Sequence, residues 1–375
     1  MNSNEIIMLE RIRKLLKKTP NLKAREIAKQ LGVDRTEVSS LMHKKKGTIF
    51  QQNDVYEWSL LPDELEIIFA GQWVDCSSFE SSLSNANLDI GSVQKVKFIL
   101  PDGCKFFLET IARFLALCNQ FISSKKEVTI DLSNNNKSMH YWNRVGFFDH
   151  LSEKATVLPD WPKSSTAKSK KGNSEKVVEF GAVDPKTENK DLINQLTDAF
   201  VARQNKNKNY ENPIFTILAE MIKNVKDHSE SKLKGFAALQ KYDGYSGRLP
   251  HIQVIVSDSG KGIAATLRPS LKEHYPKFTN KTDLELVKMV LEGKQLSKHG
   301  SNSDSGHGLG FKSSHEKASM FNAKYSIRQS NFSLEFEFKT GKLQPAKERS
   351  NLVPILGTHI CFDFDIDDSG SDCLN

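Results

Sequence analysis

Residues 218–229, LAEMIKNVKDHS, belong to a predicted helix with three polar side chains at a spacing of four: Glu220, Asn224 and His228. The apolar stripe of this helix, predicted over Pro213 to Asp227, consists of Ile217, Leu218, Met221, Ile222 and Val225. Because successive residues are rotated by about 100°, Glu220 and Asn224 lie roughly 90° from the centre of that stripe. They occupy the edge of the core, either on a solvated flank or beside a ligand.

A β-branched strand is predicted at Ile252–Val256, and it is followed by the pattern Asp258-x-Gly260-x-Gly262. An Asp at the end of a strand can direct its carboxylate toward a ligand. The two glycines allow the backbone to approach that ligand closely. Taken alone, the pattern is also typical of ordinary turns.

A glycine-rich stretch, SDSGHGLGF, places Gly306, Gly308 and Gly310 directly before a predicted helix, KSSHEKASMF. The backbone N–H groups and the positive dipole end of a helix start bind anions, above all phosphate. A simple surface loop has the same composition. The stretch therefore indicates a phosphate site only in combination with other motifs.

A fourth motif is Gly357-Thr358 in the late predicted strand PILGTHICFDFDI. The order Glu-x-x-x-Asn, D-x-G-x-G, G-x-G-x-G and Gly-Thr resembles the GHKL superfamily, named for gyrase, the ninety-kilodalton heat-shock chaperones, histidine kinases and MutL. The resemblance covers residues 177–368, about half of the chain. It implies an α+β sandwich that binds Mg-ATP.

The resemblance also implies roles for single residues. Asn224 would hold Mg²⁺, and Asp258 would accept a hydrogen bond from the adenine amino group, with Thr358 on the same edge. Gly260 and Gly262 would leave room for base and ribose. The glycines expected to surround the phosphates are Gly306, Gly308 and Gly310.

Three further residues complete the expected site. Glu220 matches the general base of the gyrase, chaperone and MutL branches. His228 either matches a His of the histidine-kinase branch or packs on the helix edge. Lys298, in a long basic segment between Gly262 and Gly306, either reaches the γ-phosphate or is solvated.

The chain departs from the histidine-kinase branch in one respect: no phosphoacceptor motif of His-Glu, a basic residue and Pro precedes the ATPase-like part. This favours ATP hydrolysis or ATP-gated switching over autophosphorylation. A homodimer that forms when ATP closes the lid is common in such families, and we keep it as an expectation.

The net charge of +7 is concentrated at the N-terminus, where residues 1–50 hold twelve Lys or Arg and five acids. Three helices and a hairpin predicted in residues 1–60 resemble a winged helix-turn-helix domain. In such a domain Arg35 would read a base edge of DNA or RNA, and Lys44, Lys45 and Lys46 would contact phosphates. The alternative is a protein-docking module.

Residues 61–160 alternate strand and helix, and the segment TIDLSNNNKSMHYWNRVGF in particular resembles a STAS-type domain of the anti-sigma-factor-antagonist kind. Such domains contact protein partners and carry a phosphoacceptor Ser. Here Ser133 and Ser138 are the nearest candidates, in a different setting. Residues 161–176, rich in Lys and Ser, predict a flexible linker, and residues 369–375 predict an acidic tail.

No apolar run approaches a membrane span, and no signal-peptide core is present. The five scattered cysteines favour a reducing compartment, so we expect a cytoplasmic protein. The sequence thus predicts an α/β protein with a winged-helix head and an ATP-hydrolysing switch. A protein kinase of the anti-sigma type and a non-enzymatic ATP sensor remain as alternatives.

Overall fold

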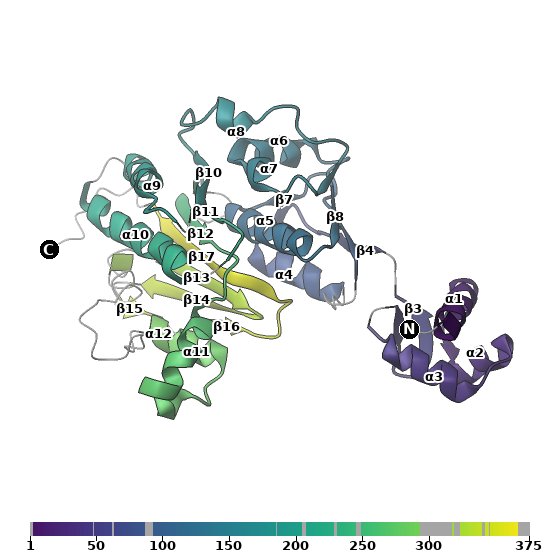
Figure 1. Cartoon of the computed structure of the whole chain (residues 1–375). Helices are drawn as coiled ribbons and strands as arrows, with labels where there is room; N and C mark the ends of the chain where they lie inside the picture. Colours follow the sequence, from purple (N-terminus) through teal and green to yellow (C-terminus); the bar gives the residue numbers. More distant parts are fainter. Residues whose placement is uncertain are drawn as a thin grey trace.

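The computed structural model describes residues 3–47, 49–61, 64–86, 93–184, 186–204, 208–228, 231–244, 249–292, 317–318, 323–339, 342–344 and 346–366 (Figure 1). In these residues the chain is a mixed α/β protein with a small N-terminal head, a four-stranded parallel sheet and an eight-stranded antiparallel sheet. Within the described part of the chain, no helix has the length and apolar character needed to cross a membrane.

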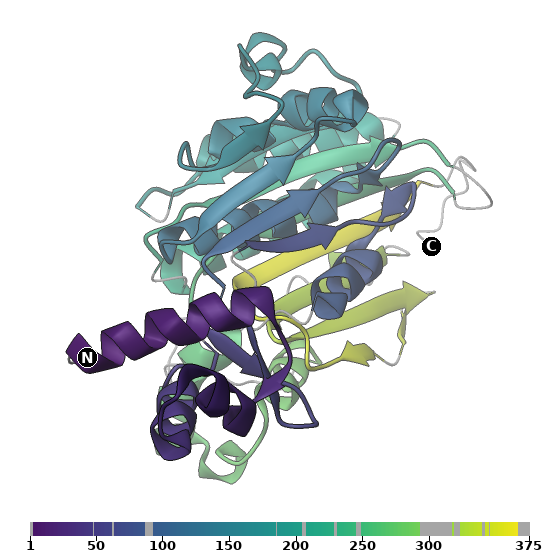
Figure 2. The ribbon, with the colours of Figure 1, turned by 90° about the vertical axis from the view of Figure 1, so that its right-hand side faces the viewer.

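The head contains the three helices and the hairpin that the sequence predicts. Its elements are α1 (Ser3–Lys18), β1 (Leu22–Lys23), α2 (Ala24–Leu31), α3 (Arg35–Lys44), β2 (Phe50–Gln52) and β3 (Glu57–Leu60), with strand order β1-β3-β2. Ile12, Ile27, Val38 and Trp58 are buried in a core of its own, separate from the other clusters. Figure 2 shows α1 crossing the head in front of the remaining sheets.

The middle part is built on a parallel sheet in the order β4-β6-β8-β9. Its strands are β4 (Glu64–Ile68), β6 (Lys95–Ile99), β8 (Glu127–Asp131) and β9 (Thr156–Leu158), and β5 (Trp73–Val74) pairs with β7 (Lys105–Phe106). Its helices are α4 (Cys76–Asn85), α5 (Leu108–Ser123), α6 (Asn136–Val145) and α7 (Phe147–His150).

Helix α5 is buried on all sides, whereas its sequence predicts a single apolar stripe. Fourteen of its sixteen residues are buried, including Arg113, Asn119 and Gln120. The cause is its position, because α5 contacts β8 of the parallel sheet and strands of the antiparallel sheet as well. Both sheets therefore cover this helix.

The first half of the segment predicted as a flexible linker is packed against the middle part. A short helix, α8 (Thr166–Ser169), lies there with Ala167 buried. Ser165 Oγ donates to Asp149 Oδ2 at 2.6 Å, and Asn143 Nδ2 donates to Ser164 O at 3.0 Å. Ser164 and Ser165 therefore contact α6 and α7.

The C-terminal part is an antiparallel sheet in the order β10-β11-β12-β17-β13-β14-β15, with β16 on β14. Its strands are β10 (Val177–Val183), β11 (Gly235–Tyr242), β12 (His251–Ser257), β13 (Ala323–Ser330), β14 (Phe332–Lys339), β15 (Lys342–Leu343), β16 (Lys347–Arg349) and β17 (Ile355–Asp365). Its α-helices are α9 (Lys190–Arg203), α10 (Glu211–His228), α11 (Ile263–His274) and α12 (Asp283–Leu291), and η1 (Lys208–Tyr210) and η2 (Pro276–Phe278) are single 3₁₀ turns.

Helix α10 packs as its sequence predicts. All five residues of the predicted stripe are buried: Ile217, Leu218, Met221, Ile222 and Val225. They share one core with the sheet residues Leu239, Val254 and Phe362. Glu220 and Asn224 are half-buried, at the edge of that core.

Candidate functional site

The strongest candidate site is at the end of β12, where Asp258 follows seven buried strand residues. Its side chain is 7% exposed, and its Oδ1 accepts a hydrogen bond from the N–H of Gly260 at 2.6 Å. Burial raises the pKa of this carboxyl to about 6, although hydrogen bonds from Gly260 and Thr358 act in the opposite direction. At pH 7 Asp258 is thus an ionised acceptor in a poorly solvated place.

The neighbouring strand β17 approaches Asp258 closely at Gly357. Gly357 has φ +94°, and a Cβ there would lie 2.0 Å from the carbonyl oxygen of Asp258. Only glycine fits this position. The next residue, Thr358, accepts a backbone hydrogen bond from Asp258 N at 3.0 Å and also hydrogen-bonds the carboxyl group. The structure therefore brings Asp258 and Thr358 together, as the sequence motifs require.

Gly262 turns the chain from this loop into α11 and has φ +80°. A Cβ at Gly262 would lie 3.4 Å from the side-chain amide of Gln329. That amide, 2% exposed on β13, donates from Nε2 to Thr358 Oγ1 at 2.8 Å. Gln329 thus orients the threonine hydroxyl. No local pattern marks Gln329, because it is one polar residue in an ordinary strand.

Helix α10 runs beside the same end of the sheet. A Cβ on Gly235 would lie 3.0 Å from both Ser257 O and Val225 Cγ1, so the last turns of α10 adjoin the residue before Asp258. Among the described residues, Asn224 Nδ2 is buried without a hydrogen-bond partner. This atom is an N–H donor, so it fits a ligand atom that accepts a hydrogen bond, whereas a metal ion would need the Oδ1 of the same amide.

Glu220 lies one helical turn before Asn224, on the same half-buried edge of α10. Among the described residues, no hydrogen bond connects Glu220 or Asn224 with Asp258. The predicted site is thus built from two adjoining groups: a pair of strand-end loops and an edge of α10. Gly306, Gly308, Gly310, Lys298 and the side chain of His228 lie outside the described residues.

Both strand-end loops also touch the middle part of the chain through Gln120 of α5. Its Nε2 donates to Ser259 Oγ and to Leu356 O, each at 2.9 Å, and its Oε1 accepts from Leu356 N at 2.9 Å. Gln120 is 7% exposed. No sequence motif indicates Gln120, because it lies more than a hundred residues from either loop and is one of several polar residues on α5.

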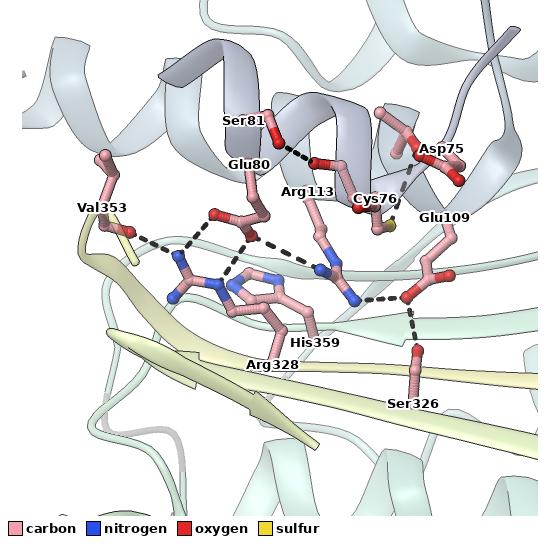
Figure 3. A network of polar contacts seen from close by, with 12 residues as sticks. Asp75, Cys76, Glu80, Ser81, Glu109, Arg113, Ser326, Arg328, Val353 and His359 are labelled. Carbon is pink, nitrogen blue, oxygen red and sulfur yellow. Dashed lines mark hydrogen bonds and ion pairs between the residues drawn. The ribbon is translucent and has the colours of Figure 1, made fainter. Parts of the chain in front are cut away.

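A buried charge network supports the strands behind the site (Figure 3). Arg328 of β13 donates in bidentate fashion to Glu80 of α4, at 2.9 and 3.1 Å. Arg113 of α5 lies 3.5 Å from Glu80 and also pairs with Glu109. Ser326 of β13 donates to the same Glu109. Two arginines and two glutamates therefore balance each other between the middle part and the antiparallel sheet.

His359, which follows Thr358, lies close to this network. Burial and the positive charges of Arg113 and Arg328 lower its pKa to about 3, so the ring is neutral at pH 7. Its Nε2 donates to Leu356 O at 3.1 Å, which leaves Nδ1 to accept from Ser257 Oγ at 2.6 Å. The histidine thus links the ends of β12 and β17.

The predicted nucleic-acid residues of the head are distributed over both ends of α3. Arg35 is exposed at its start, where Asp34 caps the helix by accepting from Thr36 N at 2.7 Å. Lys44 is exposed at the other end and pairs with Glu5 at 3.0 Å. Lys46 is exposed and Lys45 half-buried just beyond. These four residues therefore form two basic groups and no single cluster.

Comparison with models of known protein families gave no match, and comparison with curated protein sequences gave none either.

Proposed function

We propose that the C-terminal part binds Mg-ATP at the Asp258 site and acts as an ATP-hydrolysing switch. The observation that carries this proposal is the buried Asp258 carboxyl, joined to Thr358 beside a glycine that no other residue can replace. An adenine amino group supplies the N–H donor that a buried carboxylate acceptor needs. Three of the four motifs that resemble the GHKL superfamily lie on α10, after β12 and in β17, and the fourth lies outside the described residues.

In this proposal the residues of α10 lie beside the triphosphate of the nucleotide. Asn224 would hold Mg²⁺ through the oxygen of its side-chain amide, and the ion would offset the charge of the triphosphate. Glu220, one turn away, orients and polarises the attacking water as general base. Gly260 and Gly262 leave room at base and ribose, and Gly306, Gly308, Gly310 and Lys298 would contact the phosphates.

Titration calorimetry with Mg-ATP tests the adenine assignment. Asp258→Asn removes a charge-assisted hydrogen bond of roughly 1.5–3 kcal/mol, so we expect affinity to fall by about 10- to 100-fold. Asp131→Asn is a matched control: Asp131 also ends a strand, β8, and accepts a backbone hydrogen bond two residues on, from Ser133 N at 3.1 Å. Unchanged binding in the Asp258 variant would contradict the assignment.

Phosphate release tests the role of Glu220. Glu220→Ala keeps the binding loops intact, and we expect it to bind ATP like the native protein while turnover falls by about 10²–10⁴-fold. Glu211→Ala, at the exposed start of the same helix, is the control. Persistent turnover in the Glu220 variant would remove the general-base role. If the native protein binds ATP but releases no phosphate, the hypothesis of a non-enzymatic ATP sensor would be favoured.

A protein kinase of the anti-sigma type is the second candidate, and one observation bears on its acceptor. Ser138 is buried and donates its hydroxyl proton to Cys104 O, whereas Ser133 is exposed after β8. Ser133 is thus the acceptor within the chain for this candidate, and the alternative substrate is a partner protein. With γ-labelled ATP, stable label that Ser133→Ala abolishes and Ser138→Ala retains would support the kinase. Free phosphate alone would support the ATPase.

The head resembles a winged helix-turn-helix, and we propose that it binds duplex DNA or RNA through α3. Exposed Arg35 and Lys46, with the exposed Tyr56 at the β2–β3 turn, support this proposal. The middle part resembles a STAS domain and would accept a protein partner. Nucleotide state would then be coupled to nucleic-acid binding, in a monomer or in an ATP-dependent homodimer.

A further inference from the structure

The side-chain amide of Gln120 bridges the two loops of the candidate adenine site. One loop contains Ser259, between Asp258 and Gly260. The other contains Leu356, directly before Gly357. All three polar contacts of the bridge are 2.9 Å long. Since Gln120 belongs to α5, a helix of the middle part completes the framework of a site on the C-terminal sheet.

The contacts of Gln120 fix the backbone of the second loop on both sides of one residue. Leu356 N donates to Gln120 Oε1, and Leu356 O accepts from Gln120 Nε2, while the leucine side chain is 58% exposed. An exposed side chain contributes little to the placement of its own backbone. The position of Leu356, and of the Gly357-Thr358 step that follows, therefore depends on the amide of Gln120, together with the hydrogen bond that Leu356 O accepts from His359 Nε2.

The position of α5 is itself fixed by the middle part and by the charge network. Phe114 and Leu117 are fully buried in the middle core, and Arg113 and Glu109 connect the helix to Glu80 and to Ser326 of β13 (Figure 3). A shift of α5 would separate buried charges that have no water to replace their partners. Because α5 belongs to the middle part, the hydrogen bonds of Gln120 make the positions of the two loops depend on the position of the middle part.

We propose that Gln120 is a positioning residue through which the middle part regulates the affinity of the C-terminal site for its nucleotide. This inference rests on the proposed ATP site. Asp258 and Thr358 can both contact the adenine base only when the two loops keep a fixed distance from each other. Gln120 maintains that distance through its hydrogen bonds to Ser259 and Leu356. By reciprocity, a partner that displaces α5 lowers nucleotide affinity, and bound nucleotide tightens the docking of α5 by the same factor.

The test is Gln120→Met, which keeps the side-chain volume and removes all three hydrogen bonds. We expect Mg-ATP affinity to fall by about tenfold by titration calorimetry. We also expect faster hydrogen exchange at the amide of Leu356, which loses its acceptor. The matched control is Asn119→Leu. Asn119 precedes Gln120 on α5 and is similarly buried. Among the residues that the structure describes, its side chain bonds to His150 O and Ser152 N, both within the middle part.

The outcomes separate three cases. Weaker ATP binding and faster Leu356 exchange in the Gln120 variant, with both unchanged in the Asn119 variant, support the proposal. Equal losses in both variants, at equal stability in urea, overturn it in favour of a general effect on the fold. Native protein that binds no nucleotide contradicts the proposed function, and exchange at Leu356 then shows by itself whether Gln120 positions the loops.

Discussion

The two faces of the antiparallel sheet are both buried, yet they are built from different chemistry. One face packs Ala237, Leu239, Val254 and other apolar residues against α9 and α10. The other face packs Phe236, Ala238 and Ile255 into the core of the middle part. It also carries buried polar residues, which include Gln240, Gln253, Ser257, Arg328 and His359. Alternation along the strands separates the two sets, since neighbouring side chains point to opposite faces.

This difference changes what holds each face in place. Apolar burial is non-directional and tolerates many side chains of similar volume. A buried polar face is stable only when each donor and charge meets its partner. The middle part must therefore dock in one arrangement, whereas α9 and α10 depend mainly on volume.

The largest expected effect on stability comes from replacing one residue on the polar face by methionine, and the same replacement on the apolar face is the comparison. Arg328→Met leaves Glu80 without its bidentate partner, and we expect the free energy of unfolding to fall by about 3–5 kcal/mol. Leu239→Met, fully buried on the opposite face, should cost less than about 1.5 kcal/mol. Urea unfolding of both variants measures the difference. Equal losses would mean that the two faces are held in the same way.

The sequence predicts the apolar face well and the polar face poorly, for a physical reason. The stripe of α10 and the strand before Asp258 follow from periodicity alone. Residues such as Gln240 and Arg328 alternate with apolar neighbours, and that pattern is typical of strands with one face in water. Their burial comes from α4 and α5, which lie well over a hundred residues earlier in the chain.

The candidate site divides in the same manner. The motifs of the resemblance indicated Asp258, Gly357 and Thr358, and the structure brings these three residues together. Gln120 and Gln329 were not indicated, because an amide that orients another group leaves no local pattern. Sequence motifs thus indicated residues that lie together at the ends of two strands. The side chains behind them emerge only from the packing of distant elements.

A second prediction concerns the buried carboxyl group of Asp258, whose pKa is raised by burial. Asp258 has a folded pKa of about 6 against an ordinary value of 3.8, so the folded state binds more protons between these values. Stability therefore falls as pH rises from 4 toward 6, by about 3 kcal/mol in total, and the loss persists above pH 6. Asp258→Asn removes this dependence.

Urea unfolding of native protein and Asp258→Asn from pH 4 to pH 8 provides the measurement. All other titrating groups are common to both proteins, so the difference between the two curves reports Asp258 alone. We expect the variant to gain stability over the native protein as pH rises. A constant difference across this range would show that Asp258 titrates near its ordinary pKa.

The last prediction concerns charges that face water, for which we expect the smallest effect on stability. Lys44 and Lys46 are exposed, and the pair of Lys44 with Glu5 is 55% and 32% exposed at its two side chains. Exposed pairs contribute about 0–1 kcal/mol. Replacing Lys44, Lys45 and Lys46 with Ala should therefore change the unfolding free energy by less than about 1 kcal/mol.

The same triple replacement should alter nucleic-acid binding strongly. Each lysine that neutralises a phosphate contributes about 0.9 to the log–log salt slope on B-form DNA, so the slope should flatten by nearly three units for all sequences alike. Replacing Lys14, Lys17 and Lys18 with Ala makes the same charge change on exposed positions of α1 and is the control.

Replacing Arg35 should instead reduce the difference in affinity between a specific and a random duplex, because Arg35 would donate bidentately to a base edge. An equal change of slope in both triple variants would mean that only net charge matters. Salt-independent binding, or none at low ionic strength, would make the head a protein-docking module and leave the Asp258 site unaffected.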